Sequence, residues 1–166
     1  MAEYLMGIDA GTGSVRVALF DFRGQNRAYA VAEYGTTYPK NGWAEQSDYE
    51  WFEALKKAIP ECIKKAGIAA DNIAAITCDA TTNTLVYLDE NDTSVRPPIL
   101  WMDVRATEEA SFIDTIREEY DATKFYKPGF RADTMVPKCM WVKKNEPENW
   151  AKTKTIMAVS YTHLRA

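Results

Sequence analysis

The sequence is poor in the residues that build metal clusters and disulfide frameworks. It holds a single histidine, His163, and three widely separated cysteines, Cys62, Cys78 and Cys139. Three isolated cysteines predict neither a disulfide framework nor a CxxC metal pair, so we interpret them as small buried or half-buried thiols. No catalytic triad or metal cluster can be built around His163, and we interpret it as a surface residue.

An excess of basic charge and a long apolar run are also lacking. Lys and Arg number 20 against 24 Asp and Glu, and the net charge of −4 lacks the basic footprint of a general nucleic-acid binder. No apolar run approaches the roughly 20 residues that cross a bilayer. Residues 1–4 lack the features that open a signal peptide. We therefore expect a cytoplasmic protein with no nucleic-acid partner and no membrane partner.

What is present is an ordinary globular composition. Hydrophobic residues make up 46% of the 166 residues and charged residues 27%, which argues against a disordered tail, a collagen or a coiled coil. A chain of this length forms one domain of ordinary size and is long enough to bury its own core.

The first 34 residues predict three strands joined by tight turns. Residues 4–8 are a short apolar run, and residues 15–20 alternate between two faces as a strand does. A turn at residues 23–25 leads into a third strand over residues 27–34. We therefore expect a three-stranded antiparallel meander with a polar, glycine-rich loop between its first two strands.

Helices and strands mix along the rest of the chain. Ser47-Asp48-Tyr49-Glu50 matches a capping box and predicts a helix that ends near Ala66, with a kink at Pro60. Further helices are expected over residues 107–120 and 136–145, and strands over residues 73–79, 84–88 and 99–101, with a short apolar run at 156–159. This mixture predicts an α/β or α+β fold. The apolar face of the first helix is expected to comprise Phe52, Leu55, Ile59, Ile63 and Ala66.

The loop Asp9-Ala10-Gly11-Thr12-Gly13-Ser14 is the first candidate site. Its aspartate follows a buried strand and can hold Mg²⁺ through water. Its glycines let a phosphate approach the backbone, and its amides and hydroxyls suit an anion. The chain has no GxxxxGK(S/T) loop, and the loop lacks the third glycine and the following helix of a dinucleotide site. An ordinary glycine-rich hairpin turn explains the hexapeptide equally well.

The second candidate site is the polar segment at residues 77–83, where a predicted strand ends. Asp79 and Thr81 offer an acid and a hydroxyl group, which suit the hydroxyls of a polyol. The ordinary alternative is a helix cap or an Asx turn.

The third candidate site combines an aromatic residue with charged residues. Asp103 and Arg105 follow the short apolar segment that ends at Trp101, where they could bind substrate hydroxyls. An ion pair beside the following helix is the simpler interpretation. Trp43 precedes the capped helix and could serve a sugar site, or it could pack against the sheet.

Several of these segments, in this order, resemble the FGGY carbohydrate kinases of the actin-like, ribonuclease-H-like ATPase superfamily. Residues 7–16 resemble the first phosphate motif of the family, and residues 42–46 resemble the segment before its first helix. Three further segments are similar to the ribulokinase-like and xylulokinase-like members: residues 78–81, residues 100–106, and residues 132–138 with Trp141. The resemblance implies an incomplete ribonuclease-H-like α/β domain with a mixed sheet flanked by helices, in which residues 1–159 are part of the N-terminal kinase domain.

The resemblance also implies an activity and its site residues. The reaction would be ATP-dependent phosphorylation of a sugar or sugar alcohol, such as ribulose, xylulose or another polyol. Asp9 would hold Mg²⁺ through water, and Arg16 would support the loop or the phosphates. The residues that would line the ATP phosphates are Gly11, Thr12, Gly13 and Ser14. Those that would lie in or near the sugar cleft are Asp79, Thr81, Asp103 and Asp133.

The chain also departs from the family. The general-base aspartate, the second phosphate loop and the adenosine pocket lie beyond the matched stretch, so that aspartate is expected after residue 166. One lobe without its partner excludes water poorly, and we expect the chain alone to be inactive. Residues 160–166 do not resemble the family, and we interpret them as a non-native tail.

Other functions stay open at this point. The chain could be a non-catalytic lobe that binds a sugar or a nucleotide, or another ATPase of the superfamily, and a homo-oligomer is compatible with either. A nicotinamide-dependent enzyme is disfavoured because the glycine loop lacks the third glycine and leads into a strand.

Overall fold

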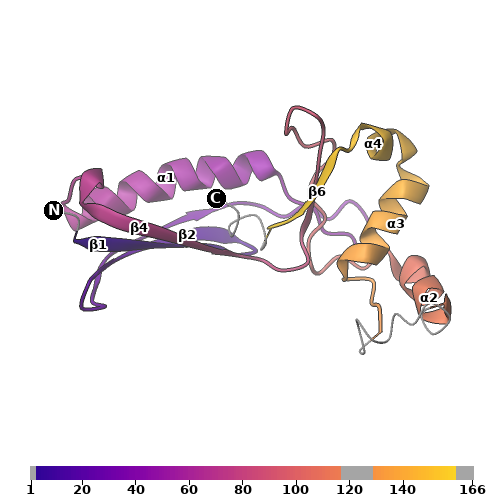
Figure 1. Cartoon of the computed structure of the whole chain (residues 1–166), viewed down its shortest axis with the longest axis horizontal. Coiled ribbons are helices and arrows are strands. Elements are labelled where there is room, and N and C mark those ends of the chain that lie inside the picture. Colours follow the sequence, from indigo (N-terminus) through magenta and orange to yellow (C-terminus); the bar gives the residue numbers. More distant parts are fainter. Residues whose placement is uncertain (1–2, 117–128, 160–166) are drawn as a thin grey trace. The chain divides into compact units, whose positions relative to one another are not determined.

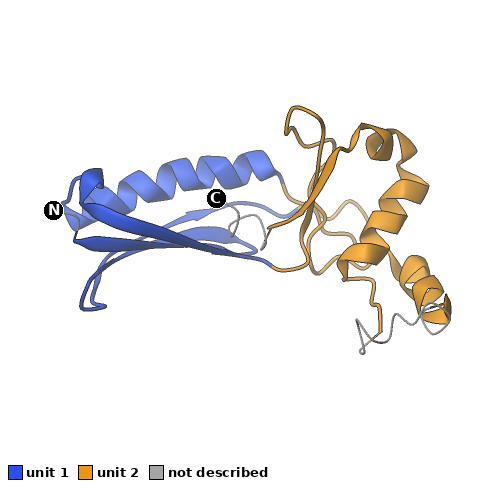
Figure 2. Cartoon of the chain, viewed as in Figure 1, with its two compact units in different colours: residues 1–36, 47–81, 160–166 blue, residues 37–46, 82–159 orange. Residues whose placement is uncertain are grey.

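The computed structural model describes residues 3–116 and 129–159 (Figure 1). The expectations for residues 117–120 and for the tail at 160–166, His163 included, lie outside the described residues. The described chain divides into two compact units, where the length alone predicted one domain (Figure 2). Unit 1 comprises residues 3–36 and 47–81. Unit 2 comprises residues 37–46, 82–116 and 129–159.

Unit 1 is built on a four-stranded mixed sheet. Its strands are β1 (Tyr4–Ala10), β2 (Ser14–Asp21), β3 (Asn26–Glu33) and β4 (Ile73–Ala80). The strand order is β3-β2-β1-β4, with β1–β2 and β2–β3 antiparallel and β1–β4 parallel. The predicted meander is therefore confirmed, and β4 returns to lie beside β1 after the helix that follows the meander.

Helix α1 (Asp48–Ala66) lies along one face of this sheet (Figure 1). The Ser47 hydroxyl accepts the Glu50 amide at 3.4 Å, as the capping motif predicts. The helix continues unbroken through Pro60 and ends at Gly67, whose φ of +66° is the left-handed conformation of a helix stop.

The buried face of α1 was predicted in part. Leu55, Ile59, Ile63 and Ala66 are partly buried and pack against the core. Phe52 is 60% exposed, so its assignment to the apolar face was wrong. The fully buried row of α1 is made of small residues, which pack against a row of alanines on β3. Small side chains on both elements let the two backbones approach closely, and a Phe would not fit between them. The helix row is Ala54, Ala58 and Cys62, and the strand row is Ala28, Ala30 and Ala32.

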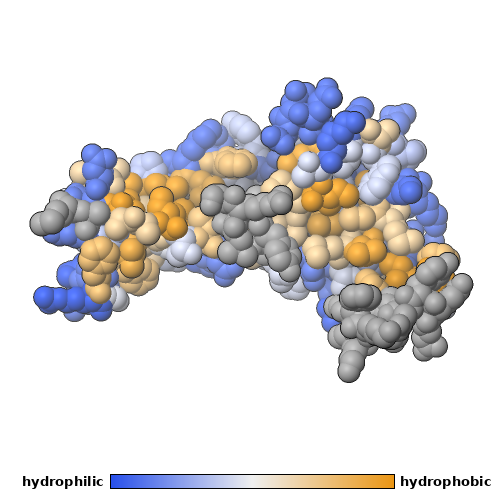
Figure 3. All heavy atoms as spheres, in the orientation of Figure 1, coloured by the Kyte–Doolittle hydropathy of each residue, from blue (hydrophilic) through white to orange (hydrophobic). Residues whose placement is uncertain are grey.

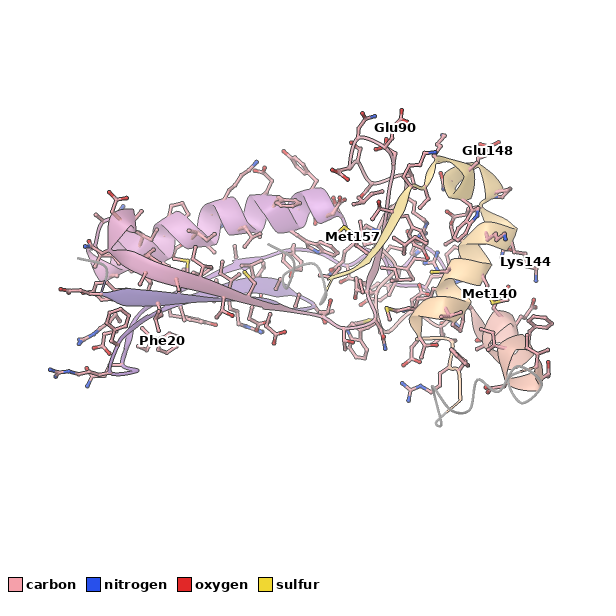
Figure 4. All side chains as sticks on the ribbon, in the orientation of Figure 1. Phe20, Glu90, Met140, Lys144, Glu148 and Met157 are labelled. Carbon is pink, nitrogen blue, oxygen red and sulfur yellow. The ribbon has the colours of Figure 1, made fainter. Side chains whose placement is uncertain are left out.

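The opposite face of the sheet carries the odd-numbered residues of β1. Because side chains alternate along a strand, Leu5, Gly7 and Asp9 lie on this face while Met6 and Ile8 are buried under α1. The β2 side chain Phe20 also points away from α1 (Figure 4). Apolar side chains lie uncovered over β4, where Ile76 is 58% exposed (Figure 3).

Unit 2 combines a two-stranded antiparallel sheet with three short helices. The strands are β5 (Leu85–Leu88) and β6 (Thr155–Ala158). The helices are α2 (Thr107–Ile116), α3 (Met135–Asn145) and α4 (Pro147–Lys152). The core of the unit is formed by Leu85, Tyr87, Ile99 and Val142.

Three details of the element prediction changed. The strand expected over residues 99–101 is reduced to isolated bridges from Ile99 to Glu45 and to Leu85. Pro97 and Pro98 precede it and carry no amide hydrogen to extend the pairing. The helix α4 and the short 3₁₀ helix η1 (Ala70–Asn72) had no sequence prediction. The described helices of both units fall short of the length and apolarity that a bilayer crossing requires.

Candidate functional site

The glycine loop between β1 and β2 is tightly closed by backbone hydrogen bonds. The Gly11 amide donates to the Ser14 carbonyl at 3.0 Å. Two further bonds come from Tyr34, which follows β3: its amide donates to the Gly13 carbonyl at 3.2 Å, and its hydroxyl donates to the Gly11 carbonyl. Burial and the nearby Asp9 carboxylate raise the pKa of Tyr34 to about 12, so its hydroxyl keeps its proton at neutral pH.

Asp9 lies between two charged neighbours on the open face of the sheet. Its partner on β2 is Arg16 and its partner on β4 is Asp79. Residues paired in register point to the same face of a sheet, about 5 Å apart. The structure thus brings together Asp9, Arg16 and Asp79, which the sequence analysis had placed in two separate candidate sites.

The ion pair between Asp9 and Arg16 is accessible to solvent. Arg16 Nη1 lies 2.9 Å from Asp9 Oδ2, and each side chain is about half exposed, at 49% for Arg16 and 48% for Asp9. The hydrogen bond to Asp9 and its charge raise the pKa of Arg16. Exposed ion pairs contribute about 0–1 kcal/mol, so a phosphate or a cation can displace one partner at little cost.

A shallow depression of about 360 Å³ surrounds this pair. Asp79 Oδ1 accepts the Ala80 amide at 2.8 Å, and the Thr81 amide donates to the Ala10 carbonyl at 3.3 Å. The Asp79 contact joins adjacent residues of β4, so it is neither the helix cap nor the Asx turn that the sequence left open. The depression is lined by Gly7, Ile8, Asp9, Arg16, Ala18, Tyr29, Thr77, Cys78 and Asp79.

The donor groups at this edge fit a magnesium–phosphate complex. Mg²⁺ is commonly held by one or two carboxylates with waters and phosphates completing its shell, and Asp9 and Asp79 supply two neighbouring carboxylates. A Cβ at Gly11 would make a tight contact of 3.3 Å with the end of the Arg16 side chain and an ordinary contact of 3.7 Å with Asp9 Oδ1, so glycine leaves more room beside this pair. The described residues contain no group of three or more acidic, histidine or cysteine ligands that would form an all-protein metal cage.

Asp103 forms the ion pair with Arg105 that was the simpler interpretation of its segment, but its burial was not predicted. Its side chain is fully buried in unit 2 and is saturated with hydrogen bonds. Oδ2 accepts the Ala44 amide at 2.6 Å, and both oxygens accept the Arg105 Nε. The simpler interpretation, an ion pair before helix α2, matches this geometry. A carboxylate enclosed in this way has no surface to offer a substrate.

Arg105 is stacked on aromatic rings inside the same unit. Its guanidinium carbon lies 4.0 Å from the Trp43 ring and 5.0 Å from the Trp141 ring, and the two rings meet edge to face. Burial opposes the charge of Arg105, but Asp103 and Glu45 outweigh it and raise its pKa. Nη1 is buried without a hydrogen-bond partner, and the neighbouring π faces compensate part of its lost hydration.

The cluster extends through residues that the sequence analysis missed. Arg96 Nη2 lies 2.6 Å from Glu45 Oε1, and Arg96 Nε lies 2.8 Å from Glu146 Oε2. Glu45 therefore joins Arg96 to Arg105. Neither Arg96 nor Glu146 stands in a motif, and they are 50 positions apart, so no local pattern could have paired them.

Asp133 lies just before helix α3 in unit 2 and forms an ion pair with Arg131. The hydrogen bond from Arg131 lowers the pKa of Asp133. Its side chain is 21% exposed and stays accessible from outside. Asp79 and Thr81 belong to unit 1, so the four residues expected in the sugar cleft are divided between the units.

The chain resembles carbohydrate kinases in sequence and in fold. The xylulose kinase of Lactococcus lactis is 33% identical over 154 residues, which are 93% of this chain and 30% of that protein. The glycerol kinase of Oleidesulfovibrio alaskensis is 31% identical over 158 residues. A crystal structure of a xyloylose kinase from Brucella ovis superposes with a TM-score of 0.87 at 27% identity, covering 96% of this chain and 33% of that one.

These matches locate the chain within larger proteins. It spans about a third of the length of the curated relatives that it matches. Its fold is the ribonuclease-H-like fold of the N-terminal part of such kinases, as predicted. Residues 4–165 match the N-terminal domain of the FGGY family of carbohydrate kinases, and the chain belongs to that family.

Proposed function

We propose that this chain is the N-terminal part of a kinase that transfers a phosphoryl group from ATP to a hydroxyl of a sugar or sugar alcohol. The observation that carries this proposal is the accessible Asp9–Arg16 pair beside Asp79, at the end of a closed glycine loop. Pentuloses are the favoured substrates because relatives named xylulose kinases are 33% identical over 93% of this chain, whereas a glycerol kinase of equal identity matches over 72% of it. Relatives named glycerol kinases keep polyols in the substrate class.

The loop and its neighbours would divide the work on the nucleotide. Asp9 would hold Mg²⁺ through water, and Arg16 with the loop residues Gly11, Thr12, Gly13 and Ser14 would meet the phosphates of ATP. Bound Mg²⁺ neutralises negative charge on the phosphates during phosphoryl transfer, in which catalysis is mainly positioning and charge stabilisation. The Tyr34 hydroxyl holds the Gly11 carbonyl, which keeps the loop in shape for that contact.

Polar side chains would bind the hydroxyls of the sugar. Asp79 and Thr81 would offer an acid and a hydroxyl, and Asp133 would offer a second acid. Trp101, which is 41% exposed, would supply an aromatic surface. Asp103 would act indirectly, because its carboxylate fixes Ala44 and Arg105 and is enclosed.

A second candidate function is a lobe that binds a sugar or a nucleotide without turnover. The chain covers about a third of its relatives, which favours this function for the chain by itself. We propose that the complete kinase has its general-base aspartate after residue 166 and that the 166-residue chain alone does not turn over. A cytoplasmic location is part of the proposal, because ATP is supplied there and the three cysteines are free thiols.

The test is sugar-dependent ADP release by the product of the longest reading frame that contains this chain. Mg-ATP would be supplied with xylulose, ribulose, ribitol or glycerol, and Asp9→Ala would be compared with a control, Glu90→Ala, at an exposed position (Figure 4). We expect turnover with one of the sugars, lost by at least about a hundredfold in Asp9→Ala and kept in Glu90→Ala. Turnover with no sugar, or full activity of Asp9→Ala, would contradict the proposed function.

A further inference from the structure

Lys138 is a fully buried ammonium group in helix α3 of unit 2. None of its surface is exposed to solvent. Its Nζ donates to the Asn83 carbonyl at 2.9 Å and to the Leu100 carbonyl at 2.7 Å. Lysines are almost never buried in this way without a partner, and here both hydrogen-bonded partners are backbone carbonyls. Burying the ammonium group of Lys138 costs desolvation free energy. This cost indicates that the two hydrogen bonds serve to fix the positions of the carbonyl groups that accept them.

The two carbonyls belong to segments that are distant in the sequence. Asn83 is 55 positions from Lys138, and Leu100 is 38 positions away. Asn83 has a φ of +54°, a left-handed conformation that asparagine adopts more readily than most residues other than glycine. The bond from Lys138 fixes the direction of its carbonyl group.

The same two segments are joined a second time. The Trp101 amide, next to Leu100, donates to the Thr84 hydroxyl at 3.3 Å, next to Asn83. Lys138 thus binds the carbonyls of Asn83 and Leu100. The Thr84 hydroxyl binds the amide of Trp101, so both contacts join the same two segments. The segment at residues 83–84 begins two positions after Thr81, and the segment at residues 100–101 carries Trp101, which is 41% exposed.

Charged groups near Lys138 do not replace the carbonyls. Asp103 and Asp133 favour its charge, and Arg105 opposes it. Burial outweighs the two carboxylates and lowers the pKa of Lys138 to about 8. The amine is therefore mostly protonated at neutral pH and donates to both carbonyls with little competition from a direct ion pair.

We propose that Lys138 is a positioning residue for the sugar side of the kinase site. By holding the Asn83 and Leu100 carbonyls, it fixes the segment that carries Trp101 against the segment that follows Thr81. It does not contact the sugar or the nucleotide. This proposal rests on the proposed function. It predicts that the affinity for the sugar depends on how firmly the segment that carries Trp101 is held in place.

The first experiment measures amide hydrogen exchange in the 166-residue chain. Lys138→Met keeps the length of the side chain and removes its donors, and Lys143→Met is the matched control at an exposed position of the same helix. We expect exchange at residues 83–85 and 99–103 to accelerate at least about tenfold in Lys138→Met, with no change in unit 1 or in the control. Unchanged exchange in these two segments would overturn the proposal.

A second variant covers the case in which Lys138→Met fails to fold. Thr84→Val removes the acceptor of the Trp101 amide with almost no change in volume and leaves Lys138 in place. We expect the same two segments to exchange faster, by a smaller factor. Exchange that stays at the level of the unsubstituted chain in Thr84→Val would show that the backbone bonds between Leu85 and Ile99 alone hold the two segments, and would overturn the proposal.

The second experiment separates positioning from a purely structural role in the complete kinase. We expect Lys138→Met to raise the KM for the sugar at least about tenfold, with kcat and the KM for ATP within about twofold. An unchanged KM for the sugar, or an equal fall in kcat alone, would overturn the proposal even if exchange accelerates. Absence of turnover in the unsubstituted kinase would overturn the proposed function and, with it, the role of Lys138 on the sugar side. Unchanged exchange in Lys138→Met would overturn the proposal about Lys138 alone.

Discussion

The two units differ in the solvent exposure of their main ion pairs. In unit 1 the central ion pair, Asp9 with Arg16, lies on an uncovered sheet face with both side chains about half exposed. In unit 2 the carboxylate of Asp103 and the guanidinium of Arg105 are fully buried. Lys138 of the same unit is enclosed as well. The Asp9–Arg16 pair of unit 1 is thus accessible to a ligand, whereas the buried charges around Asp103 fix loops of unit 2.

The difference teaches how to distinguish binding residues from framework residues in this chain. An exposed pair exchanges one partner for a ligand at a cost of about 0–1 kcal/mol. Removing one partner of a buried pair leaves an uncompensated charge and costs about 3–5 kcal/mol. Asp9 and Asp103 each follow a short apolar segment and pair with an arginine that is near in sequence, and their burial differs.

The largest expected effect is on the stability of unit 2. Asp103→Ala removes the acceptor of the Ala44 amide and leaves the buried Arg105 without its main counter-charge. We expect the free energy of unfolding to fall by about 3–5 kcal/mol, measured by urea denaturation. The control is Arg131→Ala, which breaks an exposed pair with Asp133 and is expected to cost less than about 1 kcal/mol. Similar losses in both variants would remove the distinction between buried and exposed ion pairs on which the comparison rests.

The next effect is a dependence of stability on pH. The folded pKa of Lys138 is lowered from 10.5 to about 8, so the unfolded chain binds more protons than the folded chain between these values. The free energy of unfolding of the wild type should therefore rise with pH across that interval, relative to Lys138→Met, by up to about 3 kcal/mol. Below about pH 8 the difference should be flat. Parallel pH curves for the two proteins would show that the amine is not buried.

Backbone strain gives a third, intermediate effect. Gly42 has a φ of +77°, and a Cβ there would lie 2.9 Å from Val104 Cγ2 in the same unit. Gly42→Ala is expected to lower the free energy of unfolding by about 1–3 kcal/mol, because it combines a strained conformation with a clash. Gly35→Ala is the matched control, since a Cβ there meets no atom within 4 Å. Equal melting temperatures for the two variants would contradict this expectation.

The smallest expected effect is on the glycine loop of unit 1. Tyr34→Phe removes the hydroxyl that donates to the Gly11 carbonyl and keeps the backbone bond to Gly13. We expect a loss of about 1 kcal/mol, with faster amide exchange confined to residues 11–14. Tyr29→Phe, at a 47% exposed position of β3, is the control. Exchange that accelerates equally in both variants would argue against a specific role for Tyr34.

Local patterns predicted most of the fold. The alternation in β2 and the capping residue Ser47 depend on neighbours in sequence, and both predictions were confirmed. The buried face of α1 was predicted in part: Phe52 was chosen for its hydrophobicity, but the close approach of the Ala-rich row on β3 selects Ala54 and Ala58 for the interior. Which helix residues are buried therefore depends on the surface against which the helix packs. The periodicity of the helix sequence gives no information about that surface.

The candidate site likewise combines residues that local sequence patterns reveal with residues that only long-range contacts place. The Asp9 loop could be recognised because its residues are contiguous. Its pairing with Asp79 depends on the parallel strand β4, 70 positions later in the sequence. The burial of Asp103 could not be predicted, because its enclosure is built by Ala44 and by Trp43 and Trp141 around Arg105. Long-range ion pairs such as Arg96 with Glu146 leave no signal in a single sequence.

The most direct test measures sugar-dependent ADP release and the free energy of unfolding on the same preparation of Asp9→Asn in the complete kinase. The account predicts that turnover falls by at least about a hundredfold while stability stays within about 1 kcal/mol of the wild type. Turnover that survives Asp9→Asn, or a loss of turnover explained by unfolding, would contradict the claim that the exposed charges of unit 1 form the phosphate side of the active site.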